Sequence, residues 1–242
     1  MNDNTWLTNT AVAHRGLHNE QVPENTLEAF QLAVDSHYGI EMDLQMTADG
    51  QIVVFHDDNM KRLTGLDADI REQNWDDIKQ LGILGSQQTI PTFTQFLELV
   101  NGAVPLIIEI KDHKNIGVAE HTIATILDNY KGEYCIESFN PFIVKWWAEN
   151  RPDTVRGQLS CYFRDSNLAW YKKIMLKNLF FIRSNKSQFI AYDIDDIATP
   201  MIKRLKKRLP IIAWTVRSQQ EIDNKREYFD NIIFEHFTPR MK

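Results

Sequence analysis

Residues 39–58 read GIEMDLQMTADGQIVVFHDD, and this stretch decides how many parallel strands the chain can form. Two apolar runs typical of strands, GIEMDLQM and QIVVFH, flank the dipeptide Asp49-Gly50. That dipeptide is a strong signal for a tight hairpin turn. We therefore expect the two runs to be antiparallel neighbours rather than two successive strands of a parallel sheet.

Seven further strand-like runs occur along the chain: TAVAH, VPLIIEIK, YCIESF, RGQLSCY, LFFIRS, IIAWTV and NIIFEH. Segments with helical periodicity lie between most of them, which favours a parallel sheet with helical crossovers. With the hairpin strand set aside, eight parallel strands remain, and 242 residues suit one TIM (β/α)8 barrel. We predict a single domain over residues 1–242, with a short insertion at 57–103 near the active-site mouth.

The composition predicts a soluble, cytoplasmic protein. A net charge of −6 argues against a general affinity for nucleic acid. The basic run KRLKKR at 203–208 is interpreted as a solvated helix face rather than a membrane patch. Cys135 and Cys161 lie in strand-like runs and are expected to be core residues in a reducing compartment. No segment reaches the ~18 apolar residues of a membrane span, so no stable membrane insertion is expected.

Carboxylates gather on one face of two predicted strands. Alternation within IEMDLQ places Glu41 and Asp43 on the same side, and in LIIEIK it pairs Glu109 with Lys111. Three carboxylates in one enclosed space are costly unless they are paired or bound to a metal ion. Oxygen-only ligation suits Mg²⁺ or Ca²⁺ better than Zn²⁺. The sequence therefore predicts one divalent cation held by Glu41, Asp43 and Glu109.

Two histidines end strand-like runs next to charged residues: His14 precedes Arg15, and His56 precedes Asp57. This pattern fits a general acid and a general base. Arg15 and Lys111 add two cations that suit a phosphate group. The combination suggests phosphodiester cleavage, and the chain contains neither a P-loop nor a nucleophile elbow.

With these residues in view, the sequence resembles the glycerophosphodiester phosphodiesterase family. The resemblance rests on blocks that follow the family's order along nearly the whole chain: AHRGLHNEQVPENTLEAF, GIEMDLQMTADGQIVVFHDDNMKRLTG, IPTFTQFLELV, PLIIEIK, ESF at 137–139 and AWTV at 213–216. It implies a TIM barrel with the active site at the carboxyl ends of the strands. It also implies a small-molecule glycerophosphodiester substrate, with sn-glycerol 3-phosphate and an alcohol as products.

Carried over residue by residue, the resemblance makes His14 and His56 the acid-base pair and Arg15 and Lys111 the phosphate contacts. The same carry-over gives the metal ligands already proposed. Either histidine can begin as the base, and the nucleophile is water or the neighbouring glycerol hydroxyl. Trp214 is either a wall of the glycerol pocket or a core residue.

Within PENT, Asn25 is expected to cap the first helix, with Glu28 completing the capping box. The chain departs from the family pattern after WTV, where Arg217 stands in place of asparagine. It also departs in DNIIFEHFTP, where Asn231 replaces glycine and Glu235 replaces aspartate. These departures bear on substrate preference rather than on the core chemistry.

Two alternative functions are compatible with the same residues. A lysophospholipase D would keep the site but would need an apolar channel or a membrane-binding loop. A barrel that binds phosphate esters without turnover would be expected to lack at least one of the histidines, carboxylates or cations, and all of them are present. The sequence does not specify the oligomeric state or the preferred head group.

Overall fold

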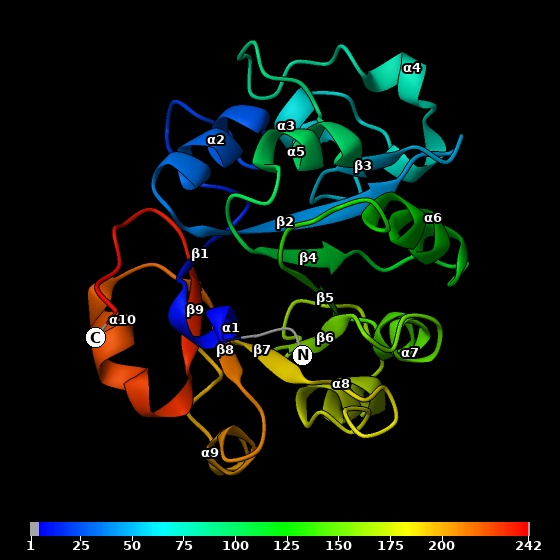
Figure 1. Ribbon diagram of the computed structural model, residues 1–242. Helices are drawn as coiled ribbons and strands as arrows, with labels where there is room; N and C mark the ends of the chain where they lie inside the picture. Colours follow the sequence, from blue (N-terminus) through cyan, green and yellow to red (C-terminus); the bar gives the residue numbers. More distant parts are fainter. Residues whose placement is uncertain (1–4, 242) are drawn as a thin grey trace. The chain divides into compact units, whose positions relative to one another are not determined.

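Strands and helices alternate along the chain in the computed structural model, which describes residues 5–241 (Figure 1). The chain divides into two compact units. One consists of residues 13–134, and the other joins residues 5–12 to residues 135–241. The short strand β1 (Val12–Ala13) lies at the boundary between them.

The unit formed by residues 13–134 is built on β2 (Gly39–Met46), β3 (Ile52–Val54) and β4 (Leu106–Ile110). Strand β2 pairs in parallel with β4 and antiparallel with β3. The turn between β2 and β3 contains Gly50 with φ 89°, a left-handed conformation that favours glycine. The hairpin predicted from Asp49-Gly50 is therefore confirmed.

Helices of this unit pack around the three strands. They are α2 (Leu27–Asp35), α3 (Lys61–Thr64), α4 (Trp75–Ile78), α5 (Phe93–Val100) and α6 (Val118–Leu127), with a 3₁₀ turn η1 (Ile70–Glu72). Helix α5 is one of the segments with helical periodicity that lie between the predicted strands. The shorter α3 and α4 were not predicted, because four residues are too few to show a helical period.

The segment between β3 and α5 has a hydrophobic cluster of its own. Its buried members are Val53, Phe55, Met60, Leu63, Ile70, Ile78, Ile83 and Ile90. These side chains come from β3, α3, η1, α4 and the adjoining loops. Their packing therefore holds the segment against β3. This packing gives a polar stretch of sequence a defined structure.

The second unit contains five parallel strands that pair in chain order: β5 (Tyr134–Ser138), β6 (Val155–Ser160), β7 (Phe189–Asp193), β8 (Ile211–Val216) and β9 (Asn231–Phe234). Its helices are α1 (Trp6–Asn9), α7 (Pro141–Asn150), α8 (Trp170–Lys177), α9 (Pro200–Lys206) and α10 (Gln219–Lys225), followed by η2 (Arg226–Tyr228). Across residues 5–241, no helix combines the length and apolar character needed to cross a membrane.

One predicted strand is wrong. The run LFFIRS at 179–184 forms turns, and the strand in this part of the chain is β7. Leu179 has φ 56°, which a strand does not accommodate, and Phe180 is 66% exposed. By contrast, the first four residues of β7 are fully buried. Apolar composition alone could not distinguish a buried strand from an exposed aromatic turn.

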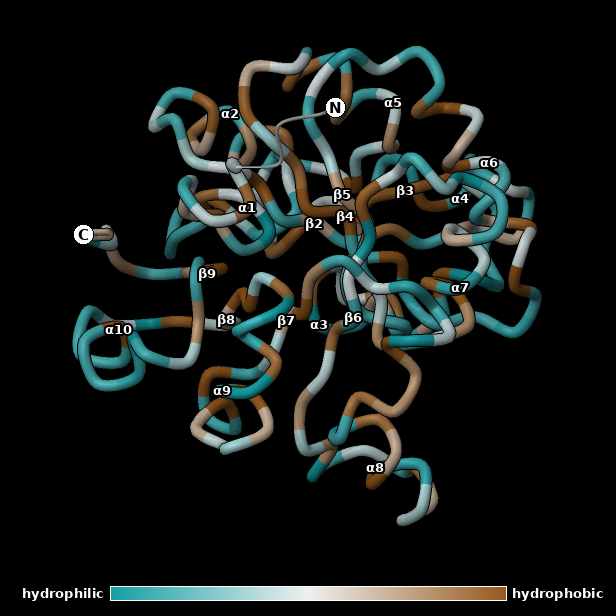
Figure 2. Tube along the Cα trace, turned by 60° about the horizontal axis from the view of Figure 1, so that its bottom comes forward, coloured by the Kyte–Doolittle hydropathy of each residue, from teal (hydrophilic) through white to brown (hydrophobic). Residues whose placement is uncertain are grey.

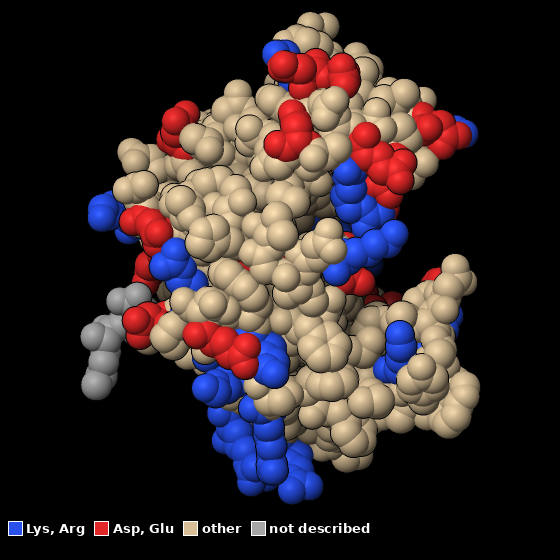
Figure 3. Space-filling model, turned by 90° about the vertical axis from the view of Figure 1, so that its right-hand side faces the viewer, with Lys and Arg blue, Asp and Glu red and all other residues tan. Residues whose placement is uncertain are grey.

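The basic run at 203–208 lies on and just after α9, and its side chains form a group on the surface (Figure 3). Lys203 pairs with Glu227 at 2.9 Å and also lies over the ring of Tyr228. Arg204 and Lys207 are exposed. This arrangement agrees with the predicted solvated helix face.

Both cysteines are free thiols. Cys135 in β5 is completely buried, as predicted, and Cys161 lies just beyond β6 and is half-buried. Burial raises the pKa of the Cys161 thiol to about 11, which keeps it protonated and unreactive near neutral pH.

Gly16 and Gly50 provide a matched test of local packing. Both have positive φ, so alanine at either position carries a backbone strain of about 1 kcal/mol. A Cβ at Gly16 would lie 2.8 Å from the carbonyl carbon of Ala29, whereas a Cβ at Gly50 would meet nothing within 4 Å. We expect Gly16→Ala to lower the free energy of unfolding in urea by roughly 2–4 kcal/mol, and Gly50→Ala by clearly less. Equal losses would show that the approach to Ala29 does not constrain position 16.

Candidate active site

Three carboxylates lie together in the unit formed by residues 13–134. Glu41 and Asp43 occupy alternate positions of β2, and Glu109 lies directly opposite Asp43 in β4. Their exposed fractions are 3%, 1% and 8%, and one oxygen atom from each lies within 4.8 Å of the others. Register between parallel strands therefore produces the acidic cluster that alternation within each strand predicts.

Two protein cations compensate much of this buried charge. Lys111 Nζ lies 2.8 Å from Glu109 Oε1 and 3.3 Å from Asp43 Oδ1, and Arg15 Nε lies 3.3 Å from Asp43 Oδ2. Burial opposes ionisation of Asp43, yet Lys111, His56 and Arg15 hold the pKa of this carboxyl well below its usual range. Three carboxylates and two cations leave a net charge of −1 within the cluster. An oxygen-rich site with residual negative charge fits a hard divalent cation.

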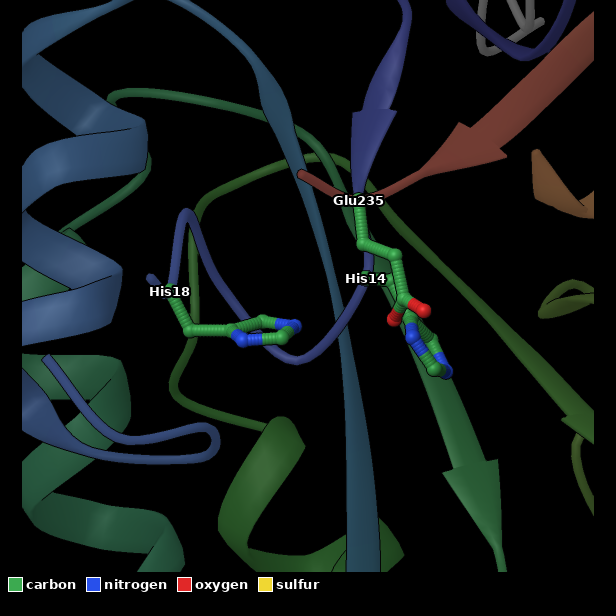
Figure 4. Close-up of side chains that lie close together, drawn as sticks. All are labelled: His14, His18 and Glu235. Carbon is green, nitrogen blue, oxygen red and sulfur yellow. The ribbon is translucent and has the colours of Figure 1, made fainter. Parts of the chain in front are cut away.

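The loop after β1 carries His14 and Arg15 to the acidic cluster. His14 Nε2 lies 3.9 Å from Glu41 Oε2, and the backbone N–H of Arg15 donates to the same oxygen at 3.0 Å. Arg15 adopts φ 52°, and this conformation turns the loop so that both contacts form. His18 lies in the same loop, with its ring centroid 6.5 Å from that of His14 (Figure 4).

The PENT segment supports the cluster differently from the prediction. Asn25 does not cap the helix. Its Nδ2 donates to Asp43 Oδ2 at 2.9 Å, and Thr26 caps α2 by accepting from the N–H of Ala29. Asn25 has φ 55° and is 1% exposed, so its amide is committed to the buried carboxylate. A capping asparagine accepts a backbone N–H through its side-chain oxygen, whereas Asn25 donates through Nδ2, and local sequence could not distinguish the two roles.

Glu24 lies between two arginines. Its Oε1 accepts from Arg15 Nη1 at 2.6 Å, and Arg62 in α3 donates to both of its carboxylate oxygens. Burial alone would raise its pKa, but the hydrogen bonds and charges of Arg62 and Arg15 lower the pKa of Glu24 to about 2. Sequence reasoning missed Arg62, which lies 38 residues from Glu24, although it belongs to the block ending in NMKRLTG that carries the family resemblance.

His56 follows β3 and is oriented from two sides. Its Nδ1 lies 2.7 Å from Asp57 Oδ1, and Asp57 in turn accepts from Arg62 Nε at 2.6 Å. Gln45 Nε2 lies within 3.2 Å of the carbonyl oxygens of residues 55, 56 and 57. Gln45 shares the strand face of Glu41 and Asp43, and this alternation is the signal that could have identified its role.

Trp214 belongs to the other unit, in β8. Its ring packs edge-on against Phe139 with centroids 5.4 Å apart, and Phe139 also contacts Phe163. Among the described residues, the buried indole N–H of Trp214 has no hydrogen-bond partner. A buried donor of this kind in an aromatic cluster has hydrogen-bonding capacity to offer a ligand.

Two of the departures from the family pattern contact each other. Arg217 follows β8, Glu235 follows β9, and Arg217 Nε donates to Glu235 Oε1 at 2.8 Å. The Glu235 side chain is 9% exposed, so its charge requires a partner. Arginine at 217 and glutamate at 235 thus form one compensated pair.

Comparison of the sequence with known proteins finds relatives that share one family description. The profile of the Glycerophosphoryl diester phosphodiesterase family matches residues 14–237. Bovine "Glycerophosphodiester phosphodiesterase 1" is 31% identical over 265 residues, covering 96% of this chain and 78% of the relative. A "Glycerophosphodiester phosphodiesterase" of Caldanaerobacter subterraneus is 34% identical over 145 residues, covering 55% of this chain and 59% of the relative.

The fold matches a solved structure over most of its length. A phosphodiesterase of Oleispira antarctica, described in complex with the product sn-glycerol-3-phosphate, superposes with a TM-score of 0.77 at 23% identity. The match covers 93% of this chain and 92% of that one. The predicted TIM (β/α)8 barrel is therefore confirmed.

The ion pairs of Glu24 predict a specific dependence of stability on pH. The pKa of Glu24 in the folded protein, about 2, lies below the ordinary value of 4.5, so the ionised carboxylate stabilises the fold above pH 4.5. This contribution, at most about 3 kcal/mol, is lost as the pH falls from 4.5 toward 2. We expect Glu24→Gln to lower the free energy of unfolding more at pH 7 than at pH 3, measured by chemical denaturation.

The exposed Glu98 in α5 supplies the matched control. We expect Glu98→Gln to change stability little at either pH. If the deficit of Glu24→Gln were the same at pH 7 and pH 3, the two arginines would not be holding Glu24 ionised.

Proposed function

Because the chain belongs to the glycerophosphoryl diester phosphodiesterase family and is an enzyme of that class, we propose that it hydrolyses glycerophosphodiesters to sn-glycerol 3-phosphate and an alcohol. The observation that carries this proposal is the convergence of three carboxylates and two cations in one unit, with His14 beside Glu41 and His56 buttressed by Asp57. The product complex described for the Oleispira relative supports the same substrate class.

The acidic cluster fits one divalent cation, Mg²⁺ or Ca²⁺. Glu41, Asp43 and Glu109 would hold it, since their oxygens converge within 4.8 Å and Asn25 fixes the orientation of Asp43. Oxygen-only ligands match the preference of both ions. When bound, such a cation would polarise the phosphoryl oxygens of the substrate.

Arg15 and Lys111 would bind the phosphodiester anion. Burial by itself disfavours both cations, but their carboxylate partners outweigh it and raise the pKa of Arg15 and of Lys111 above the ordinary values. Both side chains therefore stay charged across the neutral range. The Nε atom of Arg15 forms an ion pair with Asp43 Oδ2 at 3.3 Å, so the guanidinium is held beside the acidic cluster, where it would meet the substrate phosphate.

His14 and His56 would exchange protons with the reacting oxygens. One accepts the proton of the nucleophile, which is water or the neighbouring glycerol hydroxyl, and the other donates a proton to the departing alcohol oxygen. Asp57 engages Nδ1 of His56, which directs Nε2 of the ring toward this exchange. Gln45 donates to the backbone carbonyl of His56, and this hydrogen bond fixes the backbone position from which the imidazole ring extends.

We place Trp214 at the glycerol moiety, where its buried indole N–H can donate to a hydroxyl. Uninterrupted family similarity over residues 14–237 supports one domain with an insertion at 57–103. Two free cysteines support a reducing, cytoplasmic environment.

Replacing either proposed acid-base residue tests the histidine assignment. We expect His14→Ala and His56→Ala each to lower kcat by on the order of 10² or more and to leave the circular dichroism spectrum unchanged. The exposed His121 on α6 provides the control, since His121→Ala should retain the wild-type kcat. Near-wild-type turnover in either of the first two variants would contradict the acid-base assignment.

A substrate panel tests the reaction and the cation together. Glycerophosphodiesters and lysophospholipids are incubated with the enzyme before and after EDTA treatment, and released glycerol phosphate is measured. We expect release from the glycerophosphodiesters, its loss in EDTA, and its recovery with Mg²⁺ or Ca²⁺. Preference for lysophospholipids would favour a lysophospholipase D, and phosphate-ester binding without release would indicate a non-catalytic barrel. Full activity after exhaustive chelation would contradict the carboxylate site.

A further inference from the structure

Helix α8 is unusual because none of its eight residues is buried. Trp170 at its start is 74% exposed, and Tyr171 and Ile174 are also exposed. Phe180, in the turns just beyond the helix, is exposed as well. Figure 2 shows α8 at the end of an excursion of the chain away from β6 and β7, with hydrophobic residues along it. Water-exposed aromatic surface of this extent marks an interaction site.

Hydrogen bonds at its C-terminal end fasten α8 to the strands. Ser160 Oγ donates to the carbonyl oxygen of Leu176, and Tyr192 OH donates to that of Lys177, each at 2.9 Å. Ser160 ends β6, and Tyr192 is the penultimate residue of β7. Helix α8 therefore stands at the carboxyl ends of these strands, the end at which TIM barrels carry their active sites.

A neighbouring helix extends the exposed aromatic surface. Phe142, near the start of α7, is exposed, and its ring centroid lies 5.9 Å from that of Phe181. Because α7 follows the carboxyl end of β5, this side chain comes from the same end of the strands. We call the exposed set Phe142, Trp170, Tyr171, Ile174 and Phe180 the aromatic patch.

The segment that carries most of the aromatic patch is strongly basic, although the chain as a whole is acidic. Residues 161–188 contain one acidic residue, Asp165, and six basic ones: Arg164, Lys172, Lys173, Lys177, Arg183 and Lys186. Arg164 is engaged by Asp196, whereas Lys172, Arg183 and Lys186 are exposed. Charge complementarity therefore points to a negatively charged partner.

We propose that α8 and the aromatic patch dock this enzyme onto an anionic lipid surface. Tryptophan, tyrosine and phenylalanine settle at the boundary between lipid head groups and acyl chains, and neighbouring lysines contact the anionic head groups. A protein partner fits less well, because the centres of protein interfaces are depleted of lysine. The contact is peripheral, made by side chains. It would bring the carboxyl ends of the strands toward phosphodiesters derived from that lipid.

Vesicle binding tests the proposal directly. Wild-type protein is sedimented with phosphatidylcholine vesicles made with or without phosphatidylglycerol. We expect binding only when phosphatidylglycerol is present, and weaker binding as salt is raised. The double variant Lys172→Glu with Lys173→Glu should weaken binding by about tenfold or more. Trp170→Ser with Phe180→Ser should also weaken binding, through the loss of apolar contact.

The basic group on α9 supplies a control of equal charge change. Arg204→Glu with Lys207→Glu should leave vesicle binding within about twofold of wild type, since both side chains lie outside the α8 segment. If this variant lost binding as strongly as the α8 variants, attraction would depend on overall charge and the proposal would be wrong. Absence of wild-type binding to phosphatidylglycerol vesicles would also overturn it.

Two further measurements separate lipid docking from other outcomes. Lipids with brominated acyl chains should quench part of the tryptophan fluorescence in wild type, and less of it in Trp170→Phe. Size-exclusion chromatography reports self-association: a wild-type dimer that the Trp170→Ser, Phe180→Ser variant makes monomeric would assign the patch to a second copy and overturn the proposal. All α8 variants should hydrolyse water-soluble glycerophosphodiester at the wild-type rate, so a failure of docking is distinguishable from a failure of the proposed function.

Discussion

Three carboxylates buried within 4.8 Å of one another impose the constraint from which the rest of the site follows. Ions of like charge at that distance and depth cannot persist without compensation. The fold supplies it from several directions, through Lys111 just after β4, Arg15 from the loop after β1, and Asn25 from the PENT segment. Each of these contacts reaches Asp43, the least exposed of the three acids. The left-handed backbone at Arg15 and at Asn25 is the conformation that brings them there.

The acidic cluster was predictable because it depends on the two-residue alternation of side chains along a strand. Alternation along a strand places Glu41 and Asp43 on one face, and the turn at Asp49-Gly50 identifies β3 as a hairpin partner. The residues that support the cluster were less accessible to such reasoning. Asn25 carries a capping residue's side chain but bonds a buried carboxylate, and Arg62 acts across 38 residues of sequence. Their roles depend on tertiary contacts that no local pattern records.

The one mistaken strand has a related cause. Both LFFIRS and FIAYD are apolar and rich in β-forming residues, and only burial separates them. In the structure β7 takes the buried place, so the aromatic residues of the rejected run remain at the surface next to α8. The run predicted as a strand thus contributes an exposed aromatic side chain, Phe180, which belongs to the aromatic patch.

Arg62 indicates what the segment between β3 and β4 contributes to the site. Hydrogen bonds to Glu24 and Asp57 raise its pKa above the ordinary value, so its charge is permanent. Glu24 holds Arg15, and Asp57 holds His56, so one guanidinium in α3 connects the proposed phosphate-binding residue to one of the two proposed acid-base residues. Isolated surface ion pairs contribute little to stability, but a shared cation with two oriented carboxylates restricts both loops at once. The hydrophobic cluster beneath α3 anchors Arg62, because the next residue, Leu63, is buried within that cluster. The positions of the loops that carry Arg15 and His56 therefore depend on the packing of this segment, which contributes only His56, at its start, to the proposed acid-base pair.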